Sequence, residues 1–227
     1  MQTAFIAGAS RGLGHAIAAE LAARGWHVIG TVRDPASRTP LHDLADRSDG
    51  RVEIEHLDIA KPEQLPPLHD RLAGRRLDLL FVNAGTASNQ DTPIGAVSTA
   101  DFVEVMVTNA LSPMRVIEAL EDFVPPDGLI GAMSSGQGSI TNNTTGSREL
   151  YRGSKAALTM FMRGYAARRP DRSLVLLAPG WIRTALGGPE APFTLEESVP
   201  KIVDVLLAKH GKPGLDYLDR NGDTVPW

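Results

Sequence analysis

The heptapeptide GASRGLG, Gly8–Gly14, joins an apolar run, Thr3–Ala7, to a helical pattern, His15–Arg24. A strand, a glycine-rich turn and the start of a helix are together the parts of a pyrophosphate-binding site. Glycines let the backbone turn tightly and approach a ligand, and the first N–H groups of a helix bind anions. The glycine spacing differs from the G-x-G-x-x-G dinucleotide fingerprint, so this stretch alone leaves a plain strand-to-helix turn open as an alternative.

Composition limits the class of protein. The chain has 227 residues, of which 42% are apolar, and this suits one domain, residues 1–227, with a sizeable core. Without cysteine it forms no disulfide and uses no thiolate. A net charge of −4 argues against a nucleic-acid partner, and the histidines lack metal-ligand spacing, so we expect no metal. No apolar run approaches the roughly 20 residues of a membrane span, and we expect a cytoplasmic protein, since the first residues do not resemble a signal peptide.

Apolar strand-like runs alternate with helical patterns along the whole chain. The expected strands are Thr3–Ala7, His27–Arg33, Val52–Ile59, Leu77–Val82, Leu129–Met133, Ser173–Ala178 and Gly214–Leu218. The expected helices are His15–Arg24, Thr39–Arg47, Leu65–Leu72, Asp101–Phe123, Tyr151–Arg168 and Leu195–Ala208. Buried strands that alternate with helices predict a parallel sheet covered on both faces. We therefore expect an α/β fold, a single Rossmann-type domain with a doubly wound, mostly parallel seven-stranded sheet.

Polar and glycine-containing stretches gather where these strands are expected to end. They are Gly8–Gly14, Arg33-Asp34, Asp58, Asn83-Ala84-Gly85, Ser134-Ser135 and Pro179-Gly180. The ligand crevice of a doubly wound sheet lies beyond the carboxyl ends of its strands. We therefore expect all of these stretches to border one crevice.

Tyr151 and Lys155 are four residues apart on an expected helix and so share one face. A phenol with a pKa of about 10 is a poor acid or base at neutral pH. A neighbouring ammonium group, together with the positive ring of an oxidised nicotinamide, would lower that pKa and make the pair a general acid/base. The alternative is an ordinary surface pair, since this spacing is common.

The motifs taken together resemble the short-chain dehydrogenase/reductase family. The resemblance rests on Gly8-x-x-x-Gly12-x-Gly14, Asp58, Asn83-Ala84-Gly85, Asn109, Ser135, Tyr151-x-x-x-Lys155 and Pro179-Gly180, in this order over almost the whole chain. The stretches Ser134–Ile140 and Tyr151–Leu158 and the ending Pro226-Trp227 are similar to its C-factor/sniffer-like carbonyl reductase branch.

The resemblance implies four catalytic residues. Tyr151 would donate a proton to a carbonyl oxygen, and Lys155 would lower the pKa of that tyrosine and bind the nicotinamide ribose. Ser135 would donate a hydrogen bond to the same carbonyl oxygen. Asn109 would hold a water molecule that links Lys155 to solvent.

The resemblance also implies a nicotinamide dinucleotide site. Asp58 would meet the adenine, Asn83 and Gly85 would line the adenosine ribose region, and the segment from Pro179 to Thr184 would border the carboxamide. The full set of expected cofactor-binding residues is Gly8, Ser10, Arg11, Gly12, Leu13, Gly14, Arg33, Asp58, Ile59, Asn83, Ala84, Gly85, Tyr151, Lys155, Pro179, Gly180, Ile182 and Thr184.

The serine is the main departure from the family pattern. The usual spacing before the tyrosine would select Gly138, which has no side chain. We assign the role to Ser135 and interpret Gly138–Ser147 as a lengthened loop that absorbs the difference, as loops do at modest cost. Ser134 and Ser139 remain alternatives.

The second expected strand indicates which cofactor is bound. An NAD site places an acidic residue about twenty residues after the glycine turn to bind the ribose 2′-hydroxyl. That position is Val32 here, and it is followed by Arg33, whose guanidinium can bind a 2′-phosphate with two parallel hydrogen bonds. Arg11 lies close enough to bind it as well. We therefore expect NADP(H), provided that Asp34 faces away from the phosphate.

The predicted function is the NADPH-dependent reduction of a ketone or aldehyde, a small-molecule substrate, to an alcohol. The alternatives are oxidation of a secondary alcohol in vivo and a regulatory dinucleotide-binding protein without turnover. The loops Thr86–Val97 and Ala185–Thr194 should contact the substrate, and Gly187–Phe193 is either a lid or an inert loop. The family resemblance implies a homodimer or homotetramer that pairs through Asp101–Phe123 and Tyr151–Arg168.

A group of arginines falls near the end of the helix expected at Tyr151–Arg168. Its members are Arg163, Arg168, Arg169 and Arg172. We favour compensation of the helix dipole and solvation over anion binding for this group.

Overall fold

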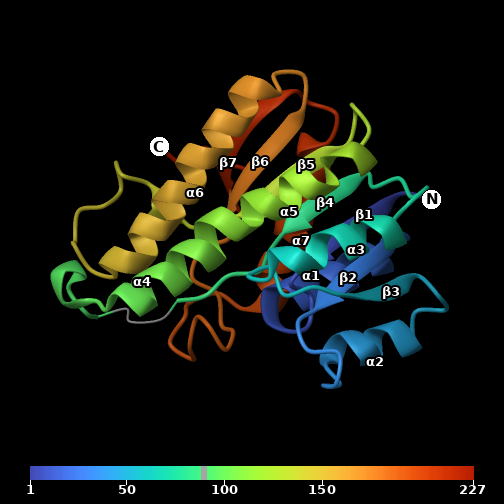
Figure 1. The fold of residues 1–227 in the computed structure, drawn as a ribbon, viewed down its shortest axis with the longest axis horizontal. Coiled ribbons are helices and arrows are strands. Elements are labelled where there is room, and N and C mark those ends of the chain that lie inside the picture. The colour runs from blue at the N-terminus through green and yellow to red at the C-terminus, as the bar shows by residue number, and fades with distance from the viewer. Residues whose placement is uncertain (88–90) are drawn as a thin grey trace.

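Seven strands form one sheet in the order β3-β2-β1-β4-β5-β6-β7, and every pairing is parallel (Figure 1). The computed structural model describes residues 1–87 and 91–227. The strands are β1 (Thr3–Ala7), β2 (His27–Val32), β3 (Val52–His56), β4 (Leu79–Val82), β5 (Leu129–Met133), β6 (Ser173–Ala178) and β7 (Gly214–Asp219). The chain winds from β1 toward β3 and then crosses back to β4, so the ligand crevice lies beyond the ends of the neighbouring strands β1 and β4.

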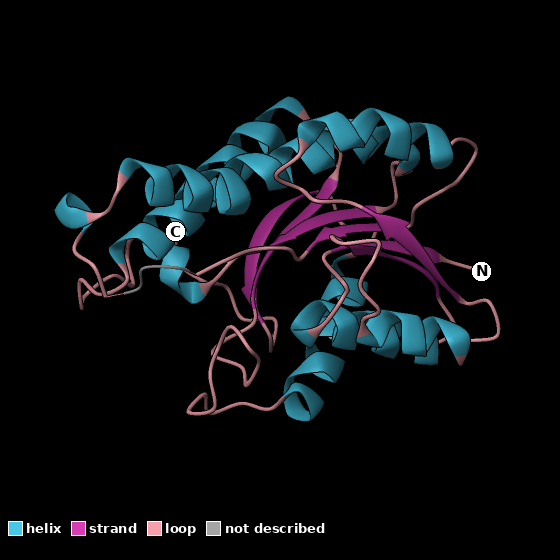
Figure 2. Ribbon diagram, turned by 60° about the horizontal axis from the view of Figure 1, so that its bottom comes forward, coloured by secondary structure: helices cyan, strands magenta, loops and turns pink. Residues whose placement is uncertain are grey.

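Helices cover both faces of the sheet (Figure 2). One face carries α1 (Gly12–Ala23), α2 (Pro40–Asp46) and α7 (Leu195–Lys209), and the other carries α3 (Leu65–Arg71), α5 (Ser112–Leu120) and α6 (Glu149–Arg168). α4 (Thr99–Met106) leads into α5 (Figure 1). The expected α/β, doubly wound, seven-stranded fold is confirmed.

The two faces of the sheet bury separate apolar clusters because successive strand residues point to opposite sides. On β1, Phe5 contributes to the cluster under α3, α5 and α6, whereas Ile6 contributes to the cluster under α1 and α7. Both side chains are fully buried. This is why the central strands consist almost entirely of apolar residues.

The expected helix Asp101–Phe123 is helical along its whole length, but it is not one regular α-helix. The structure instead has α4, a π-helical segment η3 (Val107–Leu111), α5, and a 3-10 turn η4 (Glu121–Phe123). Pro113 has no N–H and so cannot make the α-helical hydrogen bond to the carbonyl of Asn109. The N–H of Ser112 donates to the carbonyl of Val107, five residues earlier, which is the π-helical spacing. Single π-helical turns occur frequently at functional sites, and this one carries the predicted catalytic Asn109.

Other element boundaries differ by a few residues from those expected. β2 ends at Val32 instead of Arg33, and β3 ends at His56 instead of Ile59, because the chain leaves the sheet there for the crevice loops. The first helix begins at Gly12 and the sixth at Glu149, earlier than expected.

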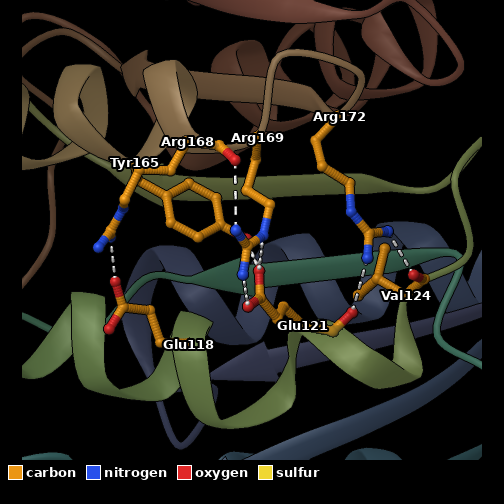
Figure 3. Close-up of polar contacts among 7 residues, drawn as sticks. All are labelled: Glu118, Glu121, Val124, Tyr165, Arg168, Arg169 and Arg172. Atoms are coloured by element: carbon orange, nitrogen blue, oxygen red, sulfur yellow. Dashed lines mark hydrogen bonds and ion pairs between the residues drawn. The ribbon is translucent and has the colours of Figure 1, made fainter.

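The predicted arginine group joins the ends of α5 and α6 (Figure 3). Arg169 forms an ion pair with Glu121 at 2.8 Å, and Tyr165 donates its hydroxyl to the same carboxylate. Arg172 donates to the backbone carbonyls of Val124 and Pro125, which directly follow the 3-10 turn η4 after α5. Arg168, Arg169 and Arg172 therefore pair with carboxylates and backbone carbonyls near the helix ends, whereas Arg163 lies over the Trp227 ring.

Candidate active site

The glycine turn between β1 and α1 depends on its glycines for two reasons, backbone conformation and close packing. Gly8 and Gly12 have φ angles of 87° and 60°, a region that L-residues rarely adopt. A Cβ on Gly8 would lie 2.7 Å from the Cβ of Ala84, and one on Gly14 would lie 2.1 Å from the carbonyl oxygen of Gly8. Gly8 is therefore required by its φ angle and by the close approach of Ala84, Gly12 by its φ angle, and Gly14 by the close approach of the Gly8 carbonyl.

The turn is held from two neighbouring strands. The side-chain amide of Asn83 donates to the carbonyl of Gly8 at 2.9 Å, and the N–H of Gly8 donates to the hydroxyl of Thr31 at 2.9 Å. The residue before the helix, Arg11, makes no capping hydrogen bond with its side chain, and the first turn of α1 carries no acidic residue. Backbone N–H groups at this helix start are therefore available to an anion.

Thr31 is a site residue that sequence reasoning missed. It is a buried hydroxyl-bearing residue in an otherwise apolar strand, which is the signal that would have found it. Its hydroxyl bonds the backbone of the glycine turn, near Ala7, where the family usually has a threonine.

The adenosine end of the crevice carries exposed guanidinium groups. Arg33 follows β2 directly, and neither it nor Arg11 donates a hydrogen bond to any other residue within the described part of the chain. The carboxylate of Asp34 accepts from the hydroxyl of Ser37 at 2.5 Å and from the N–H of Ala36 at 2.9 Å. The Ser37 hydrogen bond lowers the pKa of Asp34. Asp34 is therefore engaged within its own loop, although its carboxylate also feels the charge of Arg33, and phosphate binding by the two arginines stays a prediction.

Asp58 and Ile59 follow β3 at the same edge of the sheet. The N–H of Asp58 donates to the Gln64 side chain at 2.8 Å, and its carboxylate accepts from the N–H of Ala60 at 3.1 Å. Ile59 is buried. These contacts hold the Asp58 backbone at the crevice edge.

Tyr151 and Lys155 meet the end of β5. The Nζ atom of Lys155 donates to the carbonyl oxygen of Met133 at 2.9 Å and lies 5.9 Å from the centre of the Tyr151 ring. Burial lowers the pKa of Lys155 to about 8. Burial also raises the pKa of Tyr151, and this effect outweighs the lowering by the nearby Ser135 hydroxyl and by the charge of Arg148. The lower tyrosine pKa expected from the neighbouring ammonium group is therefore not found in the protein alone.

Asn109 is fully buried and fixes the surrounding backbone. It exchanges two hydrogen bonds of 2.8 Å with the backbone of Thr86, and its amide also donates to the hydroxyl of Ser154 at 3.0 Å. The Ser154 hydroxyl in turn donates to the carbonyl of Tyr151. A Cβ on Gly85 would lie 3.1 Å from the amide oxygen of Asn109. Asn109 thus joins the β4 loop to the catalytic helix, and its role in holding a water molecule stays a prediction.

Among the candidate serines, the structure brings Ser135 to Tyr151. A Cβ on Gly138 would lie 3.0 Å from the backbone carbonyl carbon of Lys155, so this position has little space for a side chain. Ser134 is buried, and the Ser139 hydroxyl accepts from the N–H of Asn142 at 3.1 Å. Gly138 therefore packs closely on α6, and the assignment of the catalytic role to Ser135 stays a prediction.

The segment after β6 reaches the glycine turn. A Cβ on Gly12 would lie 3.9 Å from Thr184. Ile182 is buried and pairs with Phe193 in an isolated bridge, which closes the base of the loop Ala185–Thr194. The structure therefore brings Pro179–Thr184 to the same crevice, with Gly180 in a left-handed conformation at a φ of 86°. Of the other expected substrate loop, residues 88–90 lie outside the described residues.

Residues 2–193 match the family described as short chain dehydrogenase. The chain belongs to this family. It is 36% identical over 158 residues to the C-signal protein of Myxococcus xanthus, and the match covers 66% of this chain and 93% of that protein. The predicted short-chain dehydrogenase/reductase family is thereby confirmed.

Two solved short-chain dehydrogenase structures are similar over the whole chain. A Burkholderia multivorans protein with bound NADP is 60% identical, covers 100% of this chain and 99% of its own, and superimposes with a TM-score of 0.97. A carbonyl reductase from Pseudomonas aeruginosa PAO1 in complex with NADP is 31% identical with a TM-score of 0.93, and the match covers 100% of both chains. The expected carbonyl reductase branch agrees with this similarity.

Within 1–87 and 91–227, no three His, Asp or Glu side chains gather in a way that could hold a metal ion. In the same part of the chain, no helix has the length and apolar character needed to cross a membrane.

Proposed function

We propose that this short-chain dehydrogenase reduces a ketone or an aldehyde to an alcohol with NADPH, and that Tyr151 is the general acid. The observation that carries the proposal is the meeting of the Tyr151 phenol, the Ser135 hydroxyl and the Lys155 ammonium at one end of the crevice. A pure dinucleotide-binding regulator has no need of a phenol beside an ammonium group. The carbonyl reductase from Pseudomonas aeruginosa supports the substrate class.

Each of these side chains has a distinct task. The nicotinamide supplies the hydride when it is bound. Tyr151, whose pKa is raised by burial in the protein alone, would donate its proton to the carbonyl oxygen as negative charge develops there, and the Lys155 ammonium would lower the pKa of the phenol during the reaction. Ser135 donates a hydrogen bond to the same oxygen. Lys155 uses one of its three N–H donors on Met133 and has the others for the ribose hydroxyls. Asn109 holds the water molecule through which the proton is replaced.

The residues that border the crevice suit NADP(H). The glycine turn and the uncapped start of α1 suit the pyrophosphate, and Arg11 and Arg33 suit the 2′-phosphate. Bound NADP in the similar Burkholderia multivorans and Pseudomonas aeruginosa structures supports this assignment. The remaining contacts are proposed for the adenine at Asp58 and Ile59, the adenosine ribose at Asn83, Ala84 and Gly85, and the carboxamide at Pro179, Gly180, Ile182 and Thr184.

We also propose a cytoplasmic homodimer or homotetramer. α6 runs beside the continuous helical stretch from α4 to α5 (Figure 1), and large apolar side chains are exposed on these segments. These side chains are Phe102, Val103, Leu111, Met160 and Phe161. Association through this face would remove their apolar surface from water.

The test is consumption of NADPH with a panel of aldehydes and ketones, with Tyr151→Phe as the control. Turnover that this substitution abolishes supports the proposal. Turnover only in the direction of secondary-alcohol oxidation would favour the dehydrogenase alternative. Tight NADPH binding without turnover on any member of the panel would favour a regulatory protein.

A further inference from the structure

Tyr217, on the edge strand β7, contacts the backbone of the predicted catalytic serine. Its side chain is 1% exposed, and its hydroxyl donates to the carbonyl oxygen of Ser135. β6 lies between β5 and β7 in the sheet, so the phenol spans one strand to reach this oxygen. The same oxygen accepts the N–H of Gly138 at 2.8 Å.

The backbone before Ser135 is anchored at each residue. The carbonyl of Met133 accepts from Lys155 at 2.9 Å, and the N–H of Ser134 donates to the carbonyl of Leu177 at 2.8 Å. The Ser135 carbonyl is where the chain leaves β5 for a short turn, and Tyr217 is the side chain that holds it. The direction of the Ser135 hydroxyl depends on the orientation of this backbone.

Tyr217 is itself held in place from the end of the chain. Its ring lies 5.5 Å from the ring of Trp227, and the guanidinium of Arg163 lies 4.5 Å from the same indole. The carbonyl of Trp227 accepts from both the N–H and the hydroxyl of Thr141. The phenol of Tyr217 is therefore a fixed donor.

We propose that Tyr217 is a positioning residue, which orients the Ser135 hydroxyl toward the substrate oxygen by holding the Ser135 carbonyl. The inference rests on the function proposed above for Ser135. Tyr217 acts through the backbone of another residue and does not touch the substrate itself.

The experiment compares Tyr217→Phe with Tyr165→Phe. Tyr165, near the end of α6, is also 1% exposed and donates its hydroxyl to the carboxylate of Glu121, so it matches Tyr217 in burial and in losing one hydroxyl hydrogen bond. Losing one hydrogen bond at Tyr217 should lower kcat about 3- to 10-fold and leave KM for NADPH unchanged. Tyr165→Phe should keep the wild-type kcat even where its melting temperature falls. Equal kcat values in the two variants would overturn the inference.

A double-mutant cycle with Ser135→Ala separates positioning from general damage. If Tyr217 acts only through Ser135, adding Tyr217→Phe to Ser135→Ala should lower kcat no further, whereas a full additional loss would overturn the inference. Unchanged turnover in Ser135→Ala alone would refute the proposed role of Ser135, and the inference with it. A fall in Ser135→Ala without a fall in Tyr217→Phe would refute the inference alone.

Hydrogen exchange gives a measurement that needs no substrate. The segment 134–138 contains the Gly138 N–H, which shares the Ser135 carbonyl with Tyr217. Its amides should exchange faster in Tyr217→Phe than in Tyr165→Phe. Equal protection of this segment in both variants would contradict a positioning role whatever the substrate proves to be.

Discussion

The Nζ atom of Lys155 lies 2.9 Å from the backbone carbonyl oxygen of Met133, inside the protein. A carbonyl dipole replaces only part of the hydration that an ammonium group has in water. Burial therefore lowers the pKa of Lys155 from 10.5 to about 8. Burial of the charged Lys155 side chain therefore reduces the stability of the folded protein. We attribute its presence to its role in the proposed reaction.

The first prediction concerns Lys155→Met in the protein without cofactor. Since the unfolded chain binds more protons than the folded protein between about pH 8 and 10.5, the wild type should gain stability across that window. At pH 7 the variant should have a free energy of unfolding higher by roughly 1–3 kcal/mol, because no charge is buried. Urea denaturation at pH 7 and at pH 10 measures this difference, which should shrink at the higher pH.

Lys201→Met is the control for that prediction, since Lys201 is exposed on α7. It should leave the stability unchanged at both pH values. If Lys155→Met proves no more stable than the wild type at pH 7, the burial penalty assigned to this lysine is wrong.

The second prediction concerns the proton donor. Tyr151→Phe keeps the ring and removes the acidic hydroxyl, so folding and NADPH binding should survive. Turnover should fall by about 10²–10⁴-fold, the usual contribution of general acid catalysis. Steady-state kinetics on an unactivated ketone and a fluorescence titration with NADPH measure the two effects separately. Near-normal turnover in this variant would exclude Tyr151 as the acid.

The third prediction distinguishes the three serines. Ser135→Ala should reduce kcat by about 10²–10³-fold, the cost of a lost donor to a developing oxyanion. Ser134→Ala and Ser139→Ala should lose much less, because of the three serines Ser135 is the one that lowers the pKa of Tyr151. Parallel kinetics of the three variants test this order, and the assignment moves to Ser139 if that variant is the most impaired.

The fourth prediction concerns cofactor preference. The wild type should show a kcat/KM for NADPH well above that for NADH, and Arg33→Ala should reduce the ratio mainly by raising KM for NADPH. Arg38→Ala is the matched control, because Arg38 lies in the same loop but pairs with Asp43 and Asp46. A ratio that is unchanged in Arg33→Ala, or lowered equally in Arg38→Ala, would contradict a 2′-phosphate contact at Arg33.

Much of the fold could be predicted because its evidence is local. Runs such as Phe5–Ala7 are apolar on both faces, which only a sheet covered on both sides explains. The π-helical turn inside the expected helix 101–123 was not predicted, because apolar periodicity continues through it. Apolar periodicity reports the pattern of side chains and does not report the backbone hydrogen bond that Pro113 cannot make.

The order of apolar runs and polar strand ends along the chain is sufficient to predict a doubly wound sheet and the residues at its crevice. The reason is geometric, since parallel strands carry all their carboxyl ends to one edge. The contacts of Tyr217 with Ser135, and of Thr31 with Gly8, are not available from that order. They arise from which strands become neighbours in space and from the face on which each side chain emerges. No local sequence pattern indicates a hydrogen bond between residues 82 positions apart. The Tyr217–Ser135 and Thr31–Gly8 contacts therefore exist only once the sheet has formed.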